Sequence, residues 1–223
     1  MKKYWLVLIL ICMIIFESAC SANKANLASA GRQIYEPHTR IHYFENGEIS
    51  DEETVNKYGN TEDRWVYDEG EKSVHYVYKN EYDSECRLIR RETWIDDDLD
   101  SYSVYDYDGN IRNVKTYDEG GDILGSSKAI LNEKGLATEV NFYDGEGNMT
   151  DMYMYDYDKY GNATRIVRDC YPTYNSETSF EKEINEIEYT YKKGRPVSYT
   201  NKNTIYKNGE KETSYTTCEF VYS

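Results

Sequence analysis

Apolar and polar side chains alternate along most of this chain, in short runs that end at glycine, asparagine or aspartate. In Met152 to Asp158, three tyrosines alternate with two methionines and an aspartate. Likewise, Tyr76 and Tyr78 share one face of their run, opposite His75 and Val77. A period of two predicts β-strands with one face buried, and tyrosine, valine and threonine favour such a surface.

The turns between these runs recur in two interleaved series. The first contains Gly59-Asn60, Asp83-Ser84, Gly109-Asn110, Gly135 and Gly161-Asn162, and the second contains Gly70, Asp96 to Asp98, Gly120-Gly121 and Gly147-Asn148. Each series advances by about 25 residues, which is the length of one β-hairpin with its turns. We therefore expect an all-β fold, an antiparallel meander of repeated hairpins forming a coiled open sheet or a barrel-like single domain. An open sheet would need protected edges, and the charged run Lys211 to Ser214 could supply one.

Many of the turns contain a Tyr-Asp pair followed by glycine. Glycine adopts positive φ at no steric cost, and asparagine tolerates it. The aspartate can accept a hydrogen bond from a backbone N–H two residues on, which closes an Asx-turn. The turn chemistry therefore explains the aspartates and glycines without a catalytic role.

The Tyr-x-Tyr-Asp phrase before Gly-Asn resembles the YD repeat of the rearrangement-hotspot family of bacterial surface and secreted proteins. Tyr105 to Ile111, Tyr143 to Met149 and Tyr153 to Ala163 match it best, and imperfect copies extend over residues 41–222. The resemblance implies long antiparallel sheets that coil, sometimes into a shell around a toxin. No toxin domain follows in this chain, so the resemblance implies architecture more than activity.

The chain begins with a targeting segment. Lys2 and Lys3 precede an uninterrupted apolar run from Tyr4 to Phe16, which is too short to cross ~30 Å of hydrocarbon as a helix. It suits the core of a signal peptide, so we expect the protein to be exported.

Cys20 follows the small residues Ser18 and Ala19, a pattern that resembles the lipobox of bacterial lipoproteins. Glu17 departs from that pattern, where an aliphatic residue is usual, and ordinary secretion after Ala22 or Ala30 is the alternative. The resemblance implies that Cys20 is lipidated and anchors the protein to a membrane of the cell envelope. We expect a signal peptide over residues 1–19, a lipidated cysteine and flexible tether over 20–33, and a β-domain over 34–223.

The chain is strongly acidic, with 41 aspartates and glutamates against 26 lysines and arginines. This charge disfavours nucleic acid as a partner. Beyond the lipidation site, Cys86, Cys170 and Cys218 allow at most one disulfide, and the sequence does not choose the pair. No CxxC motif or Cys/His spacing indicates zinc.

No phrase typical of catalysis occurs in the chain, and we expect neither a cofactor nor a metal. The aspartate-rich turns lack the EF-hand pattern, and solvated Asx-turns explain them. There is no Gly-x-Ser-x-Gly elbow, and the glycine turns do not open helices that bind phosphate. The three histidines, His38, His42 and His75, are expected at the surface.

Aromatic side chains are the remaining candidates for a ligand surface. Trp65, Trp94, Tyr171 and Tyr174 could stack on sugar rings or contact a protein, although most tyrosines are expected to fill the core. The alternation of apolar and polar residues stops between Tyr171 and Glu183. This predicts a longer loop, with a short helical turn over Phe180 to Ile184.

Three functions fit these features. The leading hypothesis is a non-catalytic envelope lipoprotein whose β-repeat scaffold presents a binding surface to a protein or glycan. The second is an envelope-sugar hydrolase that uses paired carboxylates. The third is an immunity or inhibitor protein for a toxin, suggested by the acidity and by the repeats.

Overall fold

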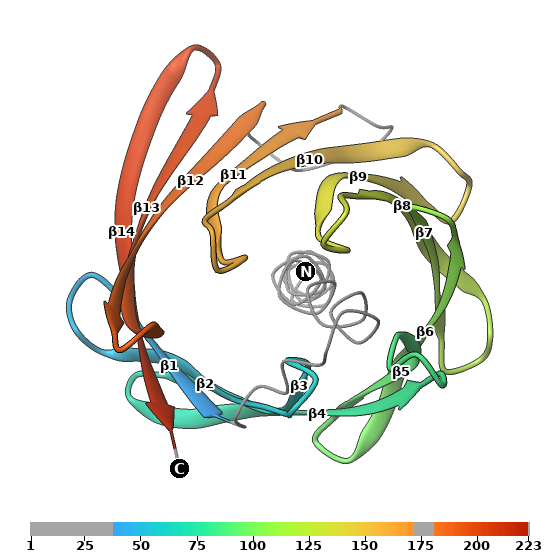
Figure 1. The fold of residues 1–223 in the computed structure, drawn as a ribbon, viewed down its shortest axis with the longest axis horizontal. Coiled ribbons are helices and arrows are strands. Elements are labelled where there is room, and N and C mark those ends of the chain that lie inside the picture. Colours follow the sequence, from blue (N-terminus) through green and yellow to red (C-terminus); the bar gives the residue numbers. More distant parts are fainter. Residues whose placement is uncertain (1–37, 172–180, 223) are drawn as a thin grey trace.

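The protein is a closed antiparallel β-barrel in which each strand pairs with its neighbours in sequence and the last strand pairs with the first (Figure 1). The computed structural model describes residues 38–171 and 181–222. Its strands are β1 (His38–Tyr43), β2 (Ile49–Val55), β3 (Thr61–Asp68), β4 (Glu71–Tyr82), β5 (Leu88–Ile95), β6 (Asp98–Asp108), β7 (Ile111–Asp118), β8 (Ile123–Leu131), β9 (Ala137–Asp144), β10 (Met149–Tyr157), β11 (Ala163–Cys170), β12 (Lys182–Lys192), β13 (Arg195–Lys207) and β14 (Glu210–Tyr222).

The predicted all-β meander of hairpins is confirmed, and the sheet closes into a barrel. β1 pairs with β14 along its whole length, from His38 opposite Tyr222 to Tyr43 opposite Thr217. Closure leaves no edge strand, but β1 pairs only with Thr217 to Tyr222 of β14, so the charged run Lys211 to Ser214 pairs with β13 alone. Among the described residues, no helix is long and apolar enough to span a bilayer.

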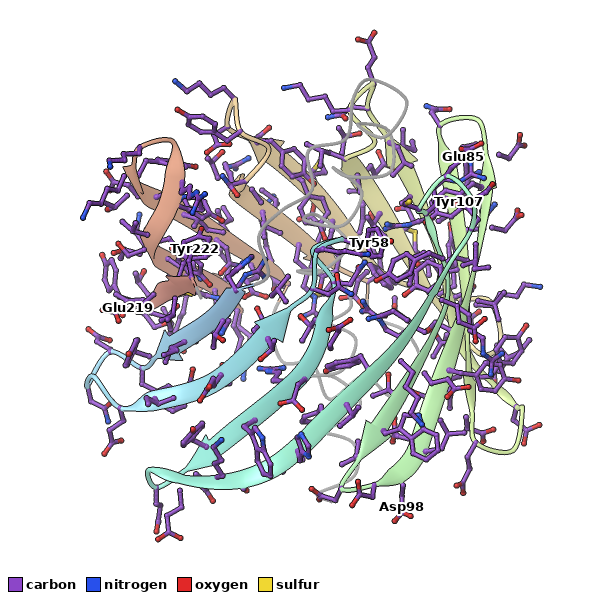
Figure 2. The ribbon with its side chains drawn as sticks, turned by 60° about the horizontal axis from the view of Figure 1, so that its bottom comes forward. Tyr58, Glu85, Asp98, Tyr107, Glu219 and Tyr222 are labelled. Carbon is purple, nitrogen blue, oxygen red and sulfur yellow. The ribbon has the colours of Figure 1, made fainter. Side chains whose placement is uncertain are left out.

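The turns lie at the two rims of the barrel. One rim, the near rim, carries the β2–β3, β4–β5, β6–β7, β8–β9, β10–β11 and β12–β13 turns, and the far rim carries the others. Glu85 and Asp98 mark these two opposite ends in Figure 2. The two series of turns in the sequence therefore correspond to the two rims.

The predicted Asx-turns close most of the wider loops. Asp144 Oδ1 accepts the backbone N–H groups of Glu146 at 3.0 Å and Asn148 at 2.8 Å. Asp158 Oδ1 does the same with Tyr160 at 2.8 Å and Asn162 at 2.9 Å. Asn56, Asp83 and Asn132 repeat this arrangement in other turns. One carboxylate or amide thus replaces two ladder hydrogen bonds at each turn.

Several other turns are tight two-residue connections. Asp96 and Asp97, between β5 and β6, both have positive φ, as do Lys193 and Gly194 between β12 and β13. Two consecutive residues with positive φ are typical of the type I′ hairpin turn, whose twist matches that of the strands.

Alternation along the strands separates an inner from an outer wall. Tyr76 and Tyr78 are buried on the inner wall, whereas their neighbours His75 and Val77 lie on the outer wall, as predicted. On β8 to β12 the inner wall is an apolar and aromatic cluster. On β1 to β3 it is instead lined by charged side chains.

One expectation about local structure was wrong. The helical turn predicted over Phe180 to Ile184 is not formed at its described end, because Lys182 to Ile184 lie in β12 and pair with β13. Separately, no disulfide joins any two of Cys86, Cys170 and Cys218.

The Asx-turns place glycine at positions where the backbone has a positive φ, which glycine adopts without strain. Gly147 has a φ of +88°, and a Cβ added there would meet nothing within 4 Å. We therefore expect Gly147→Ala to lower the free energy of unfolding by about 1 kcal/mol through backbone strain alone. Chemical denaturation measures this difference. Gly120→Ala is the control, because Gly120 does not have a positive φ, and an equal loss in both variants would contradict the argument.

Candidate functional site

The strands that close the barrel carry a row of chemically active side chains on the inner wall. His42 on β1 lies directly opposite Cys218 on β14 and directly opposite Asp51 on β2. A thiol, an imidazole and a carboxylate therefore stand side by side on three adjacent strands. We call Cys218, His42, Asp51 and Arg64 the closing cluster.

Hydrogen bonds connect the members of the closing cluster. His42 Nδ1 lies 2.8 Å from Asp51 Oδ1, and Arg64 donates from Nε to the same oxygen at 3.0 Å. His42 also hydrogen-bonds with Cys218. Cys218 is 0% exposed, whereas the side chain of His42 is 22% exposed.

Burial and charge act in opposite directions on His42. Burial alone would lower the pKa of the imidazole, but the hydrogen bonds with Asp51 and Cys218 and the charge of Asp51 raise this pKa to about 10. For Asp51, burial would raise the pKa, and His42 and Arg64 together hold it well below its usual range. The pair is therefore an imidazolium and a carboxylate near neutral pH.

A second ion pair lies beside this cluster. Arg40 donates to Glu53 at 3.0 Å, and Thr61 Oγ1 donates to the other carboxylate oxygen of Glu53 at 2.7 Å. Burial would raise the pKa of Glu53, but Arg40 and the neighbouring cations lower it. The two buried carboxylates of β2 are thus both ionised.

The burial and the protonation states of these groups limit the reactions that the inner wall could catalyse. Cys218, His42 and Asp51 have the order of a nucleophile, a base and an orienting carboxylate, but the sulfur is fully buried. A sugar hydrolase needs one carboxylic acid that stays protonated, and neither Asp51 nor Glu53 is held in that form. The expectation that all histidines lie at the surface was wrong for His42 and for His38, which is 9% exposed.

Another buried ion pair lies across the barrel on β10 to β12. Arg168 donates from Nε to Asp151 at 2.7 Å, and its guanidinium lies 3.8 Å from Glu183. Burial, together with nearby Asp151, raises the pKa of the Cys170 thiol to about 12. Cys170 is therefore a poor nucleophile near neutral pH.

The predicted tryptophans lie together on the outer wall. Trp65 on β3 stacks on His75 of β4, with ring centroids 4.1 Å apart and planes 3° apart. Trp94 on β5 lies opposite Val77, the next outward residue of β4, and Lys79 Nζ lies 3.6 Å from the centre of its ring. Trp94 Nε1 also donates to Glu92 at 3.2 Å.

The same row continues onto the next two strands. Tyr102 on β6 stacks on Tyr117 of β7 with centroids 5.0 Å apart, and Arg90 lies over the ring of Tyr102 at 4.5 Å. We call the partly exposed aromatic residues on the outer face of these five strands the outer aromatic strip: Trp65, Tyr67, His75, Trp94, Tyr102 and Tyr117.

The other two predicted ligand residues do not join this strip. Tyr171 is 40% exposed and follows β11, so β6 to β10 lie between it and Trp94 in the barrel order. Tyr174 and most of the predicted loop lie outside the described residues. The structure therefore joins Trp65 with Trp94 and leaves Tyr171 apart from them.

No metal centre is evident in the ranges 38–171 and 181–222, where no group of three His, Cys, Asp or Glu side chains is arranged to hold an ion. In the turns, the aspartate oxygens accept backbone N–H groups instead.

The raised pKa of His42 makes stability depend on pH. The stabilisation that the charged imidazole of His42 supplies is complete below its pKa in the unfolded chain, about 6.5, and is lost as pH rises through its pKa in the folded protein, about 10. We expect thermal melts of the wild type to lose roughly a few kcal/mol between these limits, and His42→Gln to lack that part. His75→Gln on the outer wall is the control and should keep it. Parallel pH curves for the wild type and His42→Gln would contradict the charged pair.

Comparison with known proteins identifies no family. No family model matches the chain, and no curated protein matches it. Among solved structures, a porin-like protein from Bacteroides uniformis is 13% identical with a TM-score of 0.28, over 85% of this chain and 98% of that one. A porin-like protein from Bacteroides vulgatus is 11% identical with a TM-score of 0.36, over 85% of this chain and 99% of that one. At these scores the likenesses support no statement about activity.

Proposed function

We propose that this protein is a non-catalytic lipoprotein of the bacterial cell envelope, whose barrel is a rigid scaffold that presents the outer aromatic strip to a glycan. The observation that carries the proposal is the strip itself, where five adjacent strands carry aromatic side chains on the outer wall. Sugar rings stack on such faces, and flanking polar groups fix their orientation.

The strip offers both kinds of contact that a glycan needs. Its rings are partly buried, so the sheet holds their positions while part of each side chain stays exposed. Lys72, Lys79 and Arg90 lie over these rings, and Glu92 lies between Trp94 and Arg90. Lysine side chains are flexible, so a sugar could displace them from the ring faces while keeping them as hydrogen-bond donors.

The outer wall supports attachment through a lipid. Exposed charged side chains point outward on successive strands, including Lys115, Lys128, Asp156, Arg165 and Glu186. Hydrocarbon solvates such groups poorly, so this wall is suited to water. Lipid chains on Cys20 would hold the protein at a membrane without contact between the wall and the bilayer.

The two alternative functions have less support. For the hydrolase, the buried carboxylates Asp51 and Glu53 are both held ionised, which leaves that pair without the required general acid. The immunity or inhibitor hypothesis rests on the acidity of the chain and on the resemblance to YD repeats.

The role of the strip can be tested by binding to isolated envelopes. We expect Trp94→Ala and Trp65→Ala to weaken binding about tenfold or more, because central aromatic side chains dominate such contacts. Tyr215→Ala is the matched control, since Tyr215 is an exposed ring on distant β14. Binding that survives protease treatment of the envelopes indicates a glycan, and binding lost with protease indicates a protein. Equal binding by all variants would contradict a role for the strip.

The lipid anchor can be tested independently of the strip. We expect Cys20→Ala to move the protein from the membrane fraction to the soluble fraction, because the thiol that carries the lipid is removed. Metabolic labelling with a fatty acid should mark the wild type and the Cys86→Ala control, but not Cys20→Ala. If fractionation does not change, the anchor assignment is wrong and the strip remains to be judged by its own test.

A further inference from the structure

Most buried arginines on the inner wall have a carboxylate partner. Arg40 pairs with Glu53 at 3.0 Å, and Arg64 pairs with Asp51 at 3.0 Å. Arg168 pairs with Asp151 at 2.7 Å. This pattern is what electrostatics requires, because a buried guanidinium is costly unless an opposite charge accompanies it.

Arg112 on β7 departs from this pattern. It is 3% exposed, and its cross-strand neighbours are Tyr107 on β6 and Ala129 on β8. Neither neighbour carries a negative charge, and no carboxylate in the described part of the chain forms an ion pair with Arg112. Its Nε–H is buried without a hydrogen-bond partner.

An orphaned buried donor on a charged group calls for a physical explanation. A bound water could accept the N–H, but it would leave the positive charge uncompensated. An oxyanion would do both, because carboxylate and phosphate oxygens accept paired hydrogen bonds from the fork of a guanidinium. The unpaired N–H and the positive charge of Arg112 therefore suit an anionic acceptor.

A second buried arginine lies within electrostatic range of the first. Arg91 on β5 is 3% exposed, and nearby Arg112 is among the causes that lower its pKa, after burial. Arg91 Nε donates to the neutral amide oxygen of Asn80 at 2.9 Å, and its terminal nitrogen donates to Asn60 at 3.4 Å. A second buried cation thus lies close to Arg112.

The surroundings of the two arginines form a defined wall. β6 runs between them and contributes Tyr105 and Tyr107 to the inner wall. Tyr105 hydrogen-bonds with Arg91, and Tyr107 donates to the carbonyl of Leu88 at 3.0 Å. Figure 2 places Tyr107 on the half of the barrel that also carries Glu85, towards the near rim.

We propose that Arg112 and Arg91, with the tyrosines of β6, form a binding site inside the barrel for an oxyanion, either a carboxylate or a phosphate group of a ligand. The site is distinct from the outer aromatic strip. It would give the inner wall a ligand chemistry of its own, in a chain whose overall charge is strongly negative.

Calorimetric titration of the full-length protein tests the site with two probes, galacturonate and inorganic phosphate, at constant ionic strength. We expect saturable binding of at least one probe, and a dissociation constant about tenfold or more weaker in Arg112→Gln, because a charge-assisted hydrogen bond is lost. Arg112→Lys keeps the charge but not the fork and should fall between them.

The matched control is Arg165→Gln, which removes the same charge from the outer wall of β11, where the side chain is 47% exposed. It should bind both probes as the wild type does. Binding of galacturonate alone identifies a carboxylate site, binding of phosphate alone a phosphate site, and binding of both a general oxyanion site. Absence of saturable binding in the wild type, or equal binding in Arg112→Gln and the wild type, overturns the proposal.

A measurement without ligand separates binding from folding. Removing a buried charge that has no partner relieves its desolvation cost. In buffer that lacks carboxylate and phosphate, Arg112→Gln should therefore melt at the same temperature as the wild type or higher. A much lower melting temperature there would mean that Arg112 is needed for the fold itself, which contradicts a site that awaits its anion.

Discussion

The pairing of the first strand with the last is the constraint on which the rest of this structure depends. Every other pairing joins strands that are consecutive in sequence, whereas β1 and β14 come from opposite ends of the described chain. This contact removes both sheet edges and so protects the backbone groups that an open meander would expose. It also fixes the curvature that separates an inner from an outer wall.

Charged side chains take part in this closure. The seam between β14, β1 and β2 combines the polar side chains of His42, Asp51 and Cys218 with the aromatic rings of Phe220 and Tyr222. A buried polar network is stable only when its members satisfy one another, so it tolerates few registers. The seam therefore specifies which residues of the two terminal strands meet, and this favours a single closed form over sheets closed one step out of register.

Much of the architecture could be predicted from local sequence. The alternation around Tyr76 and the Asx-turn at Asp144 depend on residues a few positions apart, and the structure confirms both. Closure could not be predicted, because it depends on pairing between residues far apart in sequence. For the same reason the closing cluster could not be predicted, because Cys218 and His42 come together only when β14 pairs with β1.

The candidate binding surfaces also differ in how far they could be predicted from the sequence. Trp65 and Trp94 were proposed from residue type, and the structure places them on the outer wall of the two strands that flank β4. The residues of the anion site were not predicted. From sequence alone, an arginine in a strand is expected at the solvent-exposed surface unless it is known which face of that strand points into the barrel. The alternation of Arg112 with Val114 was the available signal, since it places the arginine on the apolar face of its strand.

The cyclic order of strands restricts how a protein of this kind can change in size. In an antiparallel barrel made of consecutive strands, the first and last strands meet in opposite directions only when the number of strands is even. Loss or gain of one strand would leave the ends parallel and break the seam at His42. The number of strands can therefore change only by whole hairpins. The period of about 25 residues is thus also the smallest step by which this barrel can become wider or narrower.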